Sequence, residues 1–447
     1  MTSISNKQLT RSLLAFSLAT GFLTASCQNQ TETPSPDQGT QPDTPEQTAQ
    51  DTGDSPEALK LGSLFPTTGD LASVGQNMPK AVRLAVDTIN ACGGVNEQPV
   101  ELVQEDSQTD PTAGSAAMSK LAEVDQVAGV VGAFASSVSG ATIDIAVRNE
   151  VMQISSGSTS PVFTQRAKDG DFDGFWARTA PPDTYQARAL AKLASDRGFD
   201  RVSTVVINND YGVGFEQEFV KAFKDLGGTI VNEESPVRYD PAATTFDSEA
   251  AAAFGNDPDA VLGVLYAETG SLLMRAAYQQ GLSEGVTELL TDGVYSQEFV
   301  TDVGKTPEGQ SIINGALGTV PGASGASLEM LSQKWQEEFG EELTAFVPHS
   351  WDAAVIMMLA AEKADENTGV AIKNNYRDVA NSPGTEVSDP CEAMELIRNG
   401  EEINYQGASG DIEFDEFGDT VGSYDVWTVE EQGDLQVVDQ VQPATEG

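Results

Sequence analysis

Two neighbouring clusters of small hydroxyl residues mark the stretch Gly129–Thr164 as a candidate site. The apolar run Val127–Val131 predicts a buried strand, and Ser136 follows it at the start of a helix. A second apolar run, Val151–Ile154, ends in the serine, glycine and threonine loop 155–159, after which another helix begins. Helix N-termini and free amides attract polar and anionic groups, and small residues let a ligand approach the backbone. The stretch contains no His, Cys or Lys, so it predicts a site that holds a ligand without transforming it.

Short apolar strands alternate with amphipathic helical patterns around this stretch. The first expected strands are 59–65, 100–104, 127–131 and 151–154, with helices at 77–91, 111–123 and 137–149 between them. The pattern restarts after Pro181-Pro182, with strands at 202–207, 229–232, 260–265 and 287–290 and helices at 212–226, 243–254 and 269–280. Strands separated by helices imply parallel sheets covered on both faces. We therefore predict an α/β fold of two doubly wound lobes joined by a multi-strand hinge.

The later helical patterns, at 326–339, 350–364 and 390–399, have too few strands of their own for a third domain. We expect them to return to the first lobe, which makes several crossings and a hinge. The predicted organisation is a signal peptide at 1–27, an acidic tether at 28–57, a first lobe at 58–180, a second lobe at 181–316, a return to the first lobe at 317–424, and a crossing back to the second lobe with a tail at 425–447.

The N-terminal segment carries export signals. Lys7 and Arg11 precede the apolar run Leu13–Ala25, which is too short to span a membrane as a mature helix, and Cys27 follows. This arrangement resembles a bacterial lipoprotein signal cleaved before Cys27, which would then carry lipid; ordinary signal cleavage nearby is the alternative. Residues 28–57 contain seven acidic residues, no basic ones and no apolar core former, so they predict a disordered tether.

The chain is strongly acidic. Its 24 basic and 69 acidic residues give a formal net charge of −45, and loss of Lys7 and Arg11 with the signal brings the mature chain to about −47. A chain without a basic stripe cannot neutralise phosphates, which excludes nucleic acid as a partner. Because salt screens repulsion between exposed charges, acids spread along the chain predict a solvated surface suited to high external salt.

Two cysteines, Cys92 and Cys391, remain in the mature fold. Exported proteins favour disulfides, so we expect the two to be bonded. The sequence has no C-x-x-C motif and no Cys/His cluster, which argues against zinc. A calcium-loaded surface is the alternative interpretation of the acidity, because Asp169–Asp173 matches the start of a calcium loop. Ala180 stands where that loop needs a bidentate glutamate, so we expect no metal.

An ordered series of short segments points to a known family. The segments are 61–69 (LGSLFPTTG), 89–95 (INACGGV), 132–137, 155–164, 178–180, 210–212, 266–268, 405–410 and 414–419. In this order, from about Leu59 to Val438, they resemble the bacterial periplasmic binding proteins for branched-chain and related amino acids. That resemblance implies the type I periplasmic binding protein fold, in which two lobes close around a ligand and hold its carboxylate and ammonium.

The resemblance also implies, position by position, a set of ligand-binding residues: Ser136, Gly157, Thr159, Asp183, Tyr211, Tyr266 and Asp292. The first three lie on the first lobe, where the serine and threonine offer hydroxyls and amides and the glycine a backbone group. From the second lobe the two tyrosines cover the ligand and Asp292 pairs with its ammonium, because an uncompensated buried charge is costly. Asp183, just past the first crossing, is a further candidate.

Val74 stands where the family often has an aromatic residue, which leaves room beside the ligand, and His349 falls near another side-chain-contacting position. Each candidate also has a purely structural interpretation. Ser136 is also a candidate helix cap, Thr159 and Asp292 are candidate turn formers, and both tyrosines are candidate core residues. For His349, a surface position at the start of a helix is the favoured interpretation.

We therefore interpret the chain as a periplasmic or cell-surface solute-binding protein, lipid-anchored and monomeric. It captures an amino acid by lobe closure and presents it to the membrane permease of an ABC importer. The alternatives are a binder of amides, urea or small carboxylates for the same kind of importer, and an extracellular ligand sensor. A hydrolase needs a nucleophile and a base, and one His without a G-x-S-x-G motif does not provide them. We expect no enzymatic activity and no cofactor.

Overall fold

Five parallel strands form the sheet of the first lobe in the computed structural model, which describes residues 57–442. Their order is β2-β1-β3-β4-β5. The strands are β1 (Lys60–Phe65), β2 (Glu101–Asp106), β3 (Gly129–Gly132), β4 (Met152–Ser155) and β5 (Trp176–Arg178). Burial is complete along β3 and β4, which explains their unbroken apolar and small-residue sequences.

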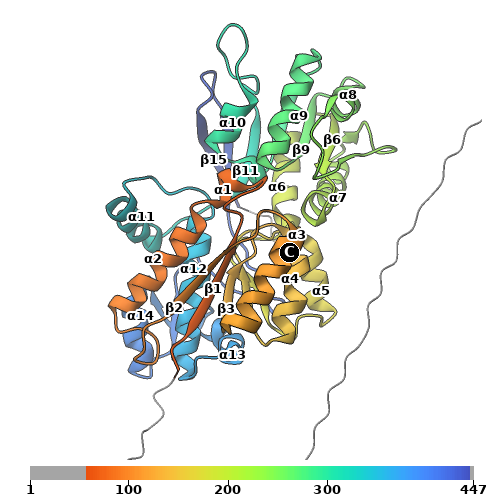
Figure 1. The fold of residues 1–447 in the computed structure, drawn as a ribbon. Coiled ribbons are helices and arrows are strands. Elements are labelled where there is room, and N and C mark those ends of the chain that lie inside the picture. The colour runs from red at the N-terminus through yellow and green to blue at the C-terminus, as the bar shows by residue number, and fades with distance from the viewer. Residues whose placement is uncertain (1–56, 443–447) are drawn as a thin grey trace, which may run out of the picture. The chain divides into compact units, whose positions relative to one another are not determined.

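Helices cover both faces of this sheet. From the N-terminal half these are α1 (Ala72–Gly75), α2 (Met78–Ala91), α3 (Pro111–Ser119) with a π-helical turn η1 (Lys120–Asp125), α4 (Ser136–Arg148) and α5 (Pro161–Lys168). In Figure 1, α2 and α12 lie on one side of β1 and β3, and α3 and α4 lie on the other. Asp110 caps α3 by accepting a hydrogen bond from the amide of Ala113, at 2.7 Å.

The second sheet has eight strands in the order β15-β14-β11-β10-β9-β6-β7, with β8 also paired to β6. The strands are β6 (Arg201–Ile207), β7 (Thr229–Ile230), β8 (Val237–Tyr239), β9 (Ala260–Val264), β10 (Thr287–Leu290), β11 (Leu317–Pro321), β14 (Tyr424–Val429) and β15 (Leu435–Val441). Its helices are α6 (Asp183–Asp196), α7 (Asp210–Asp225), α8 (Asp247–Phe254), α9 (Ala267–Gln279), the 3₁₀ turn η2 (Asp292–Val294) and α10 (Gln297–Val303). Strands β14 and β15 pair antiparallel to their neighbours, whereas the others are parallel.

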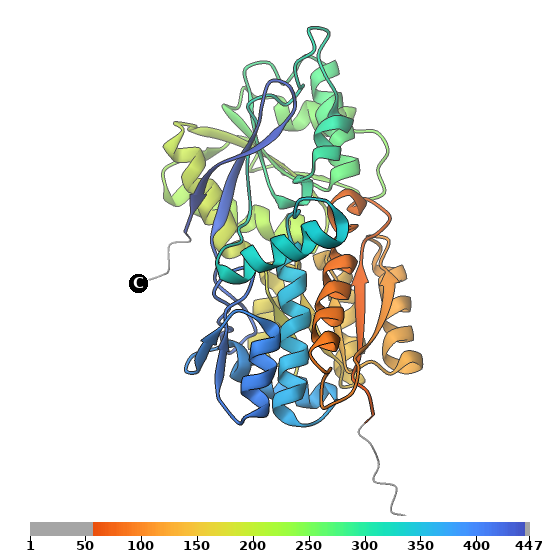
Figure 2. The ribbon, with the colours of Figure 1, turned by 90° about the vertical axis from the view of Figure 1, so that its left-hand side faces the viewer.

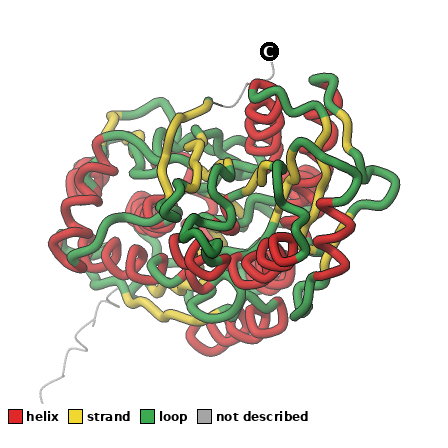
Figure 3. The backbone as a smooth tube through the Cα atoms, turned by 90° about the horizontal axis from the view of Figure 1, so that it is seen from above, coloured by secondary structure: helices red, strands yellow, loops and turns green. Residues whose placement is uncertain are grey.

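The C-terminal helices pack in the first lobe, although they follow the second in sequence. The elements are α11 (Ala326–Phe339), α12 (Val347–Ala364), α13 (Gly369–Ala380), α14 (Pro390–Arg398) and a small sheet of β12 (Thr385–Val387) and β13 (Ile403–Tyr405). Helix α12 contacts α2 and β3, and α14 contacts α2. Figure 2 shows α12 beside α2, and Figure 3, viewed from above, shows helices mainly at the left and along the lower side, with strands and loops along the upper side.

One predicted boundary is wrong. We expected the chain to re-enter the first lobe at residue 317, but Leu317–Pro321 forms β11, which pairs with β10 on one side and β14 on the other. The apolar run continues to Val320, so it supplies one more buried strand to the second sheet before the chain crosses. The sheet that this strand joins depends on pairing with β10 and β14, which the local pattern does not specify.

The predicted disulfide is confirmed. Cys92, which caps the C-terminal end of α2, is bonded to Cys391 in α14, with 5.6 Å between their Cα atoms. Arg398 of the same helix donates hydrogen bonds to the carbonyls of Cys92, at 2.9 Å, and Gly94, at 2.7 Å. The bond therefore holds the returning C-terminal helices to the N-terminal part of the first lobe.

Several expectations concern membranes, metals and the chain ends. Within residues 57–442, no helix combines the length and apolar character needed to cross a bilayer. In the same range no three His, Cys, Asp or Glu residues are grouped to hold a metal. Asp171 and Asp173 pair instead with Arg166 and Lys373, at 3.1 and 3.4 Å. The predicted signal peptide with Cys27, the predicted tether up to residue 56, and residues 443–447 lie outside the described residues.

Replacing both cysteines by serine should lower the free energy of unfolding by about 2–5 kcal/mol, because the bond closes a loop spanning 299 residues. Urea unfolding of the oxidised protein and of the Cys92→Ser/Cys391→Ser variant measures the difference. Equal midpoints and slopes for the two proteins would contradict a stabilising role for the bond.

Candidate functional site

The two hydroxyl-rich loops meet because the strands that precede them are neighbours. Val131 of β3 pairs with Ile154 of β4, so both strands end at the same edge of the sheet. The carboxyl edge of an open α/β sheet is where ligands bind. Ser155, at the end of β4, fixes the loop that follows. Its Oγ donates to the carbonyl of Ala133 at 2.6 Å and accepts from the amide of Ser158 at 2.8 Å.

Arg178 holds the same loop from the other side. Its side chain is fully buried, and Nη1 donates to the carbonyls of Ser158 and Ser160, each at 2.9 Å. Nη2 donates to Thr164 Oγ1 at 2.8 Å, and Nε pairs with Asp419 at 2.7 Å. One guanidinium therefore fixes the direction of the loop 158–164 and ties it to the segment that leads out of the first lobe.

The three predicted first-lobe residues are all buried at this edge. Ser136 is not the helix cap: Ala135 holds that position, and the Ser136 hydroxyl accepts a hydrogen bond from the amide of Ser160, at 3.3 Å. Thr159 is not a turn former satisfied by its own loop, since its Oγ1 has no hydrogen-bond partner within residues 57–442. The amide of Gly157 is already donated to Ser155 Oγ, at 3.2 Å.

The predicted second-lobe residues follow the ends of three adjacent strands, β6, β9 and β10. The rings of Tyr211 and Tyr266 are stacked, with 5.8 Å between centroids and 12° between planes. The Tyr211 hydroxyl donates to Thr291 Oγ1 at 2.7 Å and lies 3.2 Å from Asp292 Oδ1. The Tyr266 hydroxyl accepts from Asn209 at 3.1 Å. Both tyrosines are therefore held in place by polar contacts next to the carboxylate of Asp292.

Asp292 is buried, and its hydrogen-bond partners in the described chain are the neutral side chains of Gln186 and Tyr211. Gln186 Nε2 donates to its Oδ1 at 2.8 Å and also to the carbonyl of Thr319 at 3.0 Å. Burial raises the pKa of Asp292 to about 6, while the hydrogen bonds from Gln186 and Tyr211 act in the opposite direction. A cation that reaches this carboxylate would stabilise its charged form.

Asp183 is a second buried carboxyl near the site. Its amide donates to the carbonyl of Thr159 at 2.8 Å, but neither carboxyl oxygen has a hydrogen-bond partner within the described chain. Burial raises the pKa of Asp183 well above its usual range, and the charge of Asp292 raises it further. The site therefore contains two interacting acids, of which the deeper one favours its protonated form.

A small cavity lies between these two groups of residues. It is lined by Leu71, Phe134, Ala135, Ser136, Gly157, Tyr211, Tyr266, Asp292 and Gly293, so five of the seven predicted residues share it. Thr159 and Asp183 do not line the cavity, and they lie behind it in contact with each other's backbone. Its volume is about 10 Å³, which is room for about one water molecule.

The lobes are in contact around this cavity. Asp70 of the first lobe accepts hydrogen bonds from the amide and hydroxyl of Thr269, at 2.8 and 2.7 Å. On the other side Ser160 Oγ donates to the carbonyl of Asp210, at 2.7 Å. Hydrogen bonds therefore join the two lobes on both sides of the cavity.

Several residues of the site did not emerge from the sequence. Phe134 and Leu71 line the cavity, and Arg178 and Gln186 position its loops and its acid. Phe134 gave a usable signal, because it lies two residues before Ser136 in the loop that the pattern had already singled out. The prediction for His349 is wrong: it is buried, and burial lowers its pKa to about 3.

We predict that Arg178→Met lowers the free energy of unfolding by about 3–5 kcal/mol, because it leaves Asp419 and two loop carbonyls buried without their partner. Lys192→Met is the matched control, since its pair with Asp196 is exposed and such pairs contribute about 0–1 kcal/mol. Urea unfolding compares the two variants. A loss no larger than that of the control would mean that Arg178 does not organise the loop.

Comparison with known proteins places this geometry in a family. Residues 77–432 match the model of the receptor family ligand binding region. The chain is 26% identical over 366 residues, covering 80% of it and 83% of the relative, to the chemotactic signal transduction system substrate-binding protein BasB of Halobacterium salinarum. It is 27% identical over 367 residues to Leu/Ile/Val-binding protein homolog 2 of Brucella abortus, covering 81% of this chain and 87% of the relative.

A crystal structure of the leucine binding protein LivK of Thermotoga maritima superposes with a TM-score of 0.72 at 24% identity, covering 86% of this chain and 99% of that one. The family and these relatives comprise solute-binding proteins and receptors rather than enzymes. The chain thus belongs to the protein family described as the receptor family ligand binding region. It has the two-lobed fold of the type I periplasmic binding proteins.

Proposed function

We propose that the chain captures an amino acid between its two lobes and delivers it to the permease of an ABC-type importer. One observation carries this proposal: a loop rich in hydroxyls and amides on one lobe and the buried acid Asp292 on the other line the same cavity. The first suits a carboxylate and the second an ammonium, which together define a zwitterion. The names of the Brucella abortus and Thermotoga maritima relatives agree with this ligand class.

The seven predicted residues have the following proposed roles. Ser136 and Thr159 bind the ligand carboxylate, with backbone groups of Gly157 beside them. Tyr211 and Tyr266 cover the ligand from the second lobe, and Asp292 accepts the ammonium. Asp183 supports the loop through the hydrogen bond that its amide donates to the carbonyl of Thr159.

The alternative ligands, small carboxylates and neutral amides such as urea, differ from an amino acid in carrying no positive charge. A small carboxylate without an ammonium would bring a second negative charge beside Asp292, and the described lining of the cavity contains no Lys or Arg to offset it. Urea and simple amides are neutral and would leave the acids uncompensated. Both ligand classes are therefore less well matched to the site than a zwitterion.

A sensor role is the second candidate function. The Halobacterium salinarum relative is named as a substrate-binding protein of a chemotactic signal transduction system. The same closed form that a permease recognises would also suit a separate signalling receptor. Binding the soluble chain to membranes that contain the permease, with and without ligand, separates the two candidates.

We further propose that the protein works outside the cytoplasmic membrane as a monomer anchored through a lipidated Cys27. The Cys92–Cys391 disulfide supports an oxidising compartment. The acidic surface is suited to an exterior with high salt. Mass spectrometry of the N-terminal peptide from membrane fractions tests the anchor.

Asp292→Asn should abolish the response to amino acids while the fold is kept. Removing one partner of a buried ion pair costs about 2–5 kcal/mol of binding, so a ligand that raises the melting temperature of the natural protein should do so no longer. A thermal-shift screen of the amino acids, urea, acetamide and benzoate measures this, with the exposed Asp196→Asn as control. An unchanged shift for an amino acid in Asp292→Asn would refute the proposed orientation.

Binding should weaken as the pH falls through about 6. The free protein holds a proton on Asp292 below that value, and the ligand ammonium must displace it before the ion pair forms. Affinity should fall by up to about tenfold for each further pH unit. Calorimetry in buffers of different ionisation enthalpy should detect release of about one proton at pH 5 and little at pH 7.5. Constant affinity between pH 5 and 7.5 would contradict an ammonium on this acid.

A further inference from the structure

Helix α9 of the second lobe receives its N-terminal cap from the first lobe. Its own N-cap residue, Tyr266, makes no side-chain hydrogen bond to the helix. The acceptor is Asp70, in the loop between β1 and α1, to which Thr269 donates its amide at 2.8 Å and its hydroxyl at 2.7 Å. Amides in the first turn of a helix need an acceptor, and an aspartate is one of the best. A residue of one lobe therefore completes a helix of the other.

The loop that carries Asp70 is fixed within the first lobe. Asp106, at the end of β2, accepts hydrogen bonds from the amides of Thr67 and Thr68, at 3.0 and 3.3 Å, and from the Thr68 hydroxyl at 2.6 Å. Gly69 has a φ of +85°, and a Cβ there would lie 2.1 Å from a backbone oxygen, so the chain turns tightly at this point. The carboxylate of Asp70 is therefore presented to the second lobe from a well-defined position.

Thr269 links Asp70 to a tyrosine of the candidate site. Its hydroxyl donates to Asp70, so its oxygen is free to accept from the Tyr239 hydroxyl, which lies 3.1 Å away. The Tyr239 oxygen in turn accepts the amide of Tyr266 at 3.3 Å. Tyr266 lines the small cavity of the candidate site. Three hydrogen bonds thus connect the first-lobe carboxylate to a residue that would cover the ligand.

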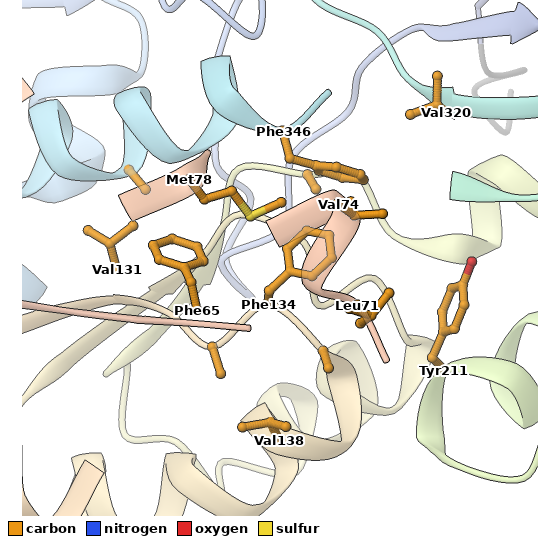
Figure 4. Packing of buried hydrophobic residues seen from close by; sticks show 14 of the residues in the cluster. Phe65, Leu71, Val74, Met78, Val131, Phe134, Val138, Tyr211, Val320 and Phe346 are labelled. Atoms are coloured by element: carbon orange, nitrogen blue, oxygen red, sulfur yellow. The ribbon is translucent and has the colours of Figure 1, made fainter. Parts of the chain in front are cut away.

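The cap also lies directly beside the cavity on the first-lobe side. Asp70 does not line the cavity, but the next residue, Leu71, does, together with Phe134 of the first lobe and Tyr211 of the second. Figure 4 shows Leu71 between the rings of Phe134 and Tyr211. A change in the position of the Asp70 loop would therefore move part of the cavity wall.

The donors that stabilise the Asp70 carboxylate all come from the second lobe. Burial raises the pKa of Asp70, whereas hydrogen bonds from Thr269 and from the amide of Glu268 lower it. A negative charge at a helix N-terminus is also favoured by the helix dipole. Separation of the lobes would remove these interactions together, because the loop stays with the first lobe and α9 with the second.

We propose that Asp70 is a positioning residue that raises the affinity for the ligand without touching it, because it caps α9 only when the lobes are together. The cap then favours the closed form, and a ligand that needs the closed form binds more tightly. This inference rests on the proposed function, which requires the lobes to open and close. It adds a determinant of affinity that lies outside the binding pocket and acts on every ligand alike.

Calorimetric titration with the twenty amino acids, each tested separately, measures this effect. Every amino acid that binds the natural protein should bind Asp70→Ala about fivefold more weakly, which is the usual effect of losing an aspartate cap. Asp70→Asn keeps an acceptor for the Thr269 amide and should recover part of the affinity. The double variant Asp70→Ala/Thr269→Val should bind no more weakly than Asp70→Ala, because both changes act on one contact.

Asp110→Ala is the matched control. Asp110 caps α3 in the same way, with 2.7 Å to the amide of Ala113, but both residues belong to the first lobe. This variant should lower the melting temperature while its affinity for each amino acid stays within twofold. Melting curves followed by circular dichroism establish that all the variants are folded before they are compared.

Three results would overturn the proposal while the proposed function stands: unchanged affinities in Asp70→Ala, equal weakening in Asp110→Ala, or weakening that differs more than threefold between amino acids. If no amino acid binds the natural protein, the proposed function fails, and small-angle X-ray scattering of the ligand-free proteins decides on the cap alone. A larger radius of gyration for Asp70→Ala than for Asp110→Ala would then support the cap, and equal radii would overturn it.

Discussion

The buried ion pair between Arg178 and Asp419 is the constraint on which the site depends. Arg178 ends β5, and Asp419 lies just before the last crossing into the second lobe. A guanidinium has five donors in a rigid planar array, and here the described contacts engage it with a carboxylate, two carbonyls and a hydroxyl. A different path of the loop would leave buried donors of Arg178 without acceptors. The free-energy penalty of an unpaired buried donor exceeds the net stabilisation that a typical single hydrogen bond contributes. The binding loop is therefore a rigid half-site, and the movement needed for ligand entry must occur at the crossings.

Electrostatics then explain why a ligand would favour the closed form. Asp183 and Asp292 are both buried, the charge of Asp292 raises the pKa of Asp183, and neither carboxyl has a basic hydrogen-bonding partner among the described contacts. An ammonium placed between the lobes offsets the cost of ionising these acids only when both lobes surround it. On the proposed function, the ligand would therefore have a higher affinity for the closed conformation than for the open one, which is the condition for a ligand to shift that equilibrium.

Much of this architecture could be predicted because it depends on local patterns. Strand β10 has the predicted bounds 287–290, and both hydroxyl loops follow their predicted strands, since buried strands and loop-forming residues are evident in sequence. Helices α6 and α13 were not predicted. Helix α6 starts at Asp183 directly after two prolines, in a segment that also resembles a linker. The sheet to which β11 belongs depends on long-range pairing, which no local pattern specifies.

The site was predictable only where one residue type implies one role. The serine-rich loop indicates polar recognition from its own residues, whereas the binding role of Asp292 was implied only by the family resemblance, because an aspartate after a strand is also a common turn former. The roles of Arg178 and Phe134 depend instead on partners far along the chain: Asp419 in one case and Phe346 in the other. His349 is buried because α12 is covered along nearly its whole length, including by contacts with α2 and α13 that its own sequence does not reveal.

The most direct test of the central claim is a crystal structure of the mature chain grown with the amino acid that raises its melting temperature most. The account predicts a closed form in which the ligand nitrogen lies within about 3.2 Å of an Asp292 carboxylate oxygen and the ligand carboxylate faces Ser136 and Thr159. A ligand bound in the opposite orientation, or bound without any contact to Asp292, would contradict it.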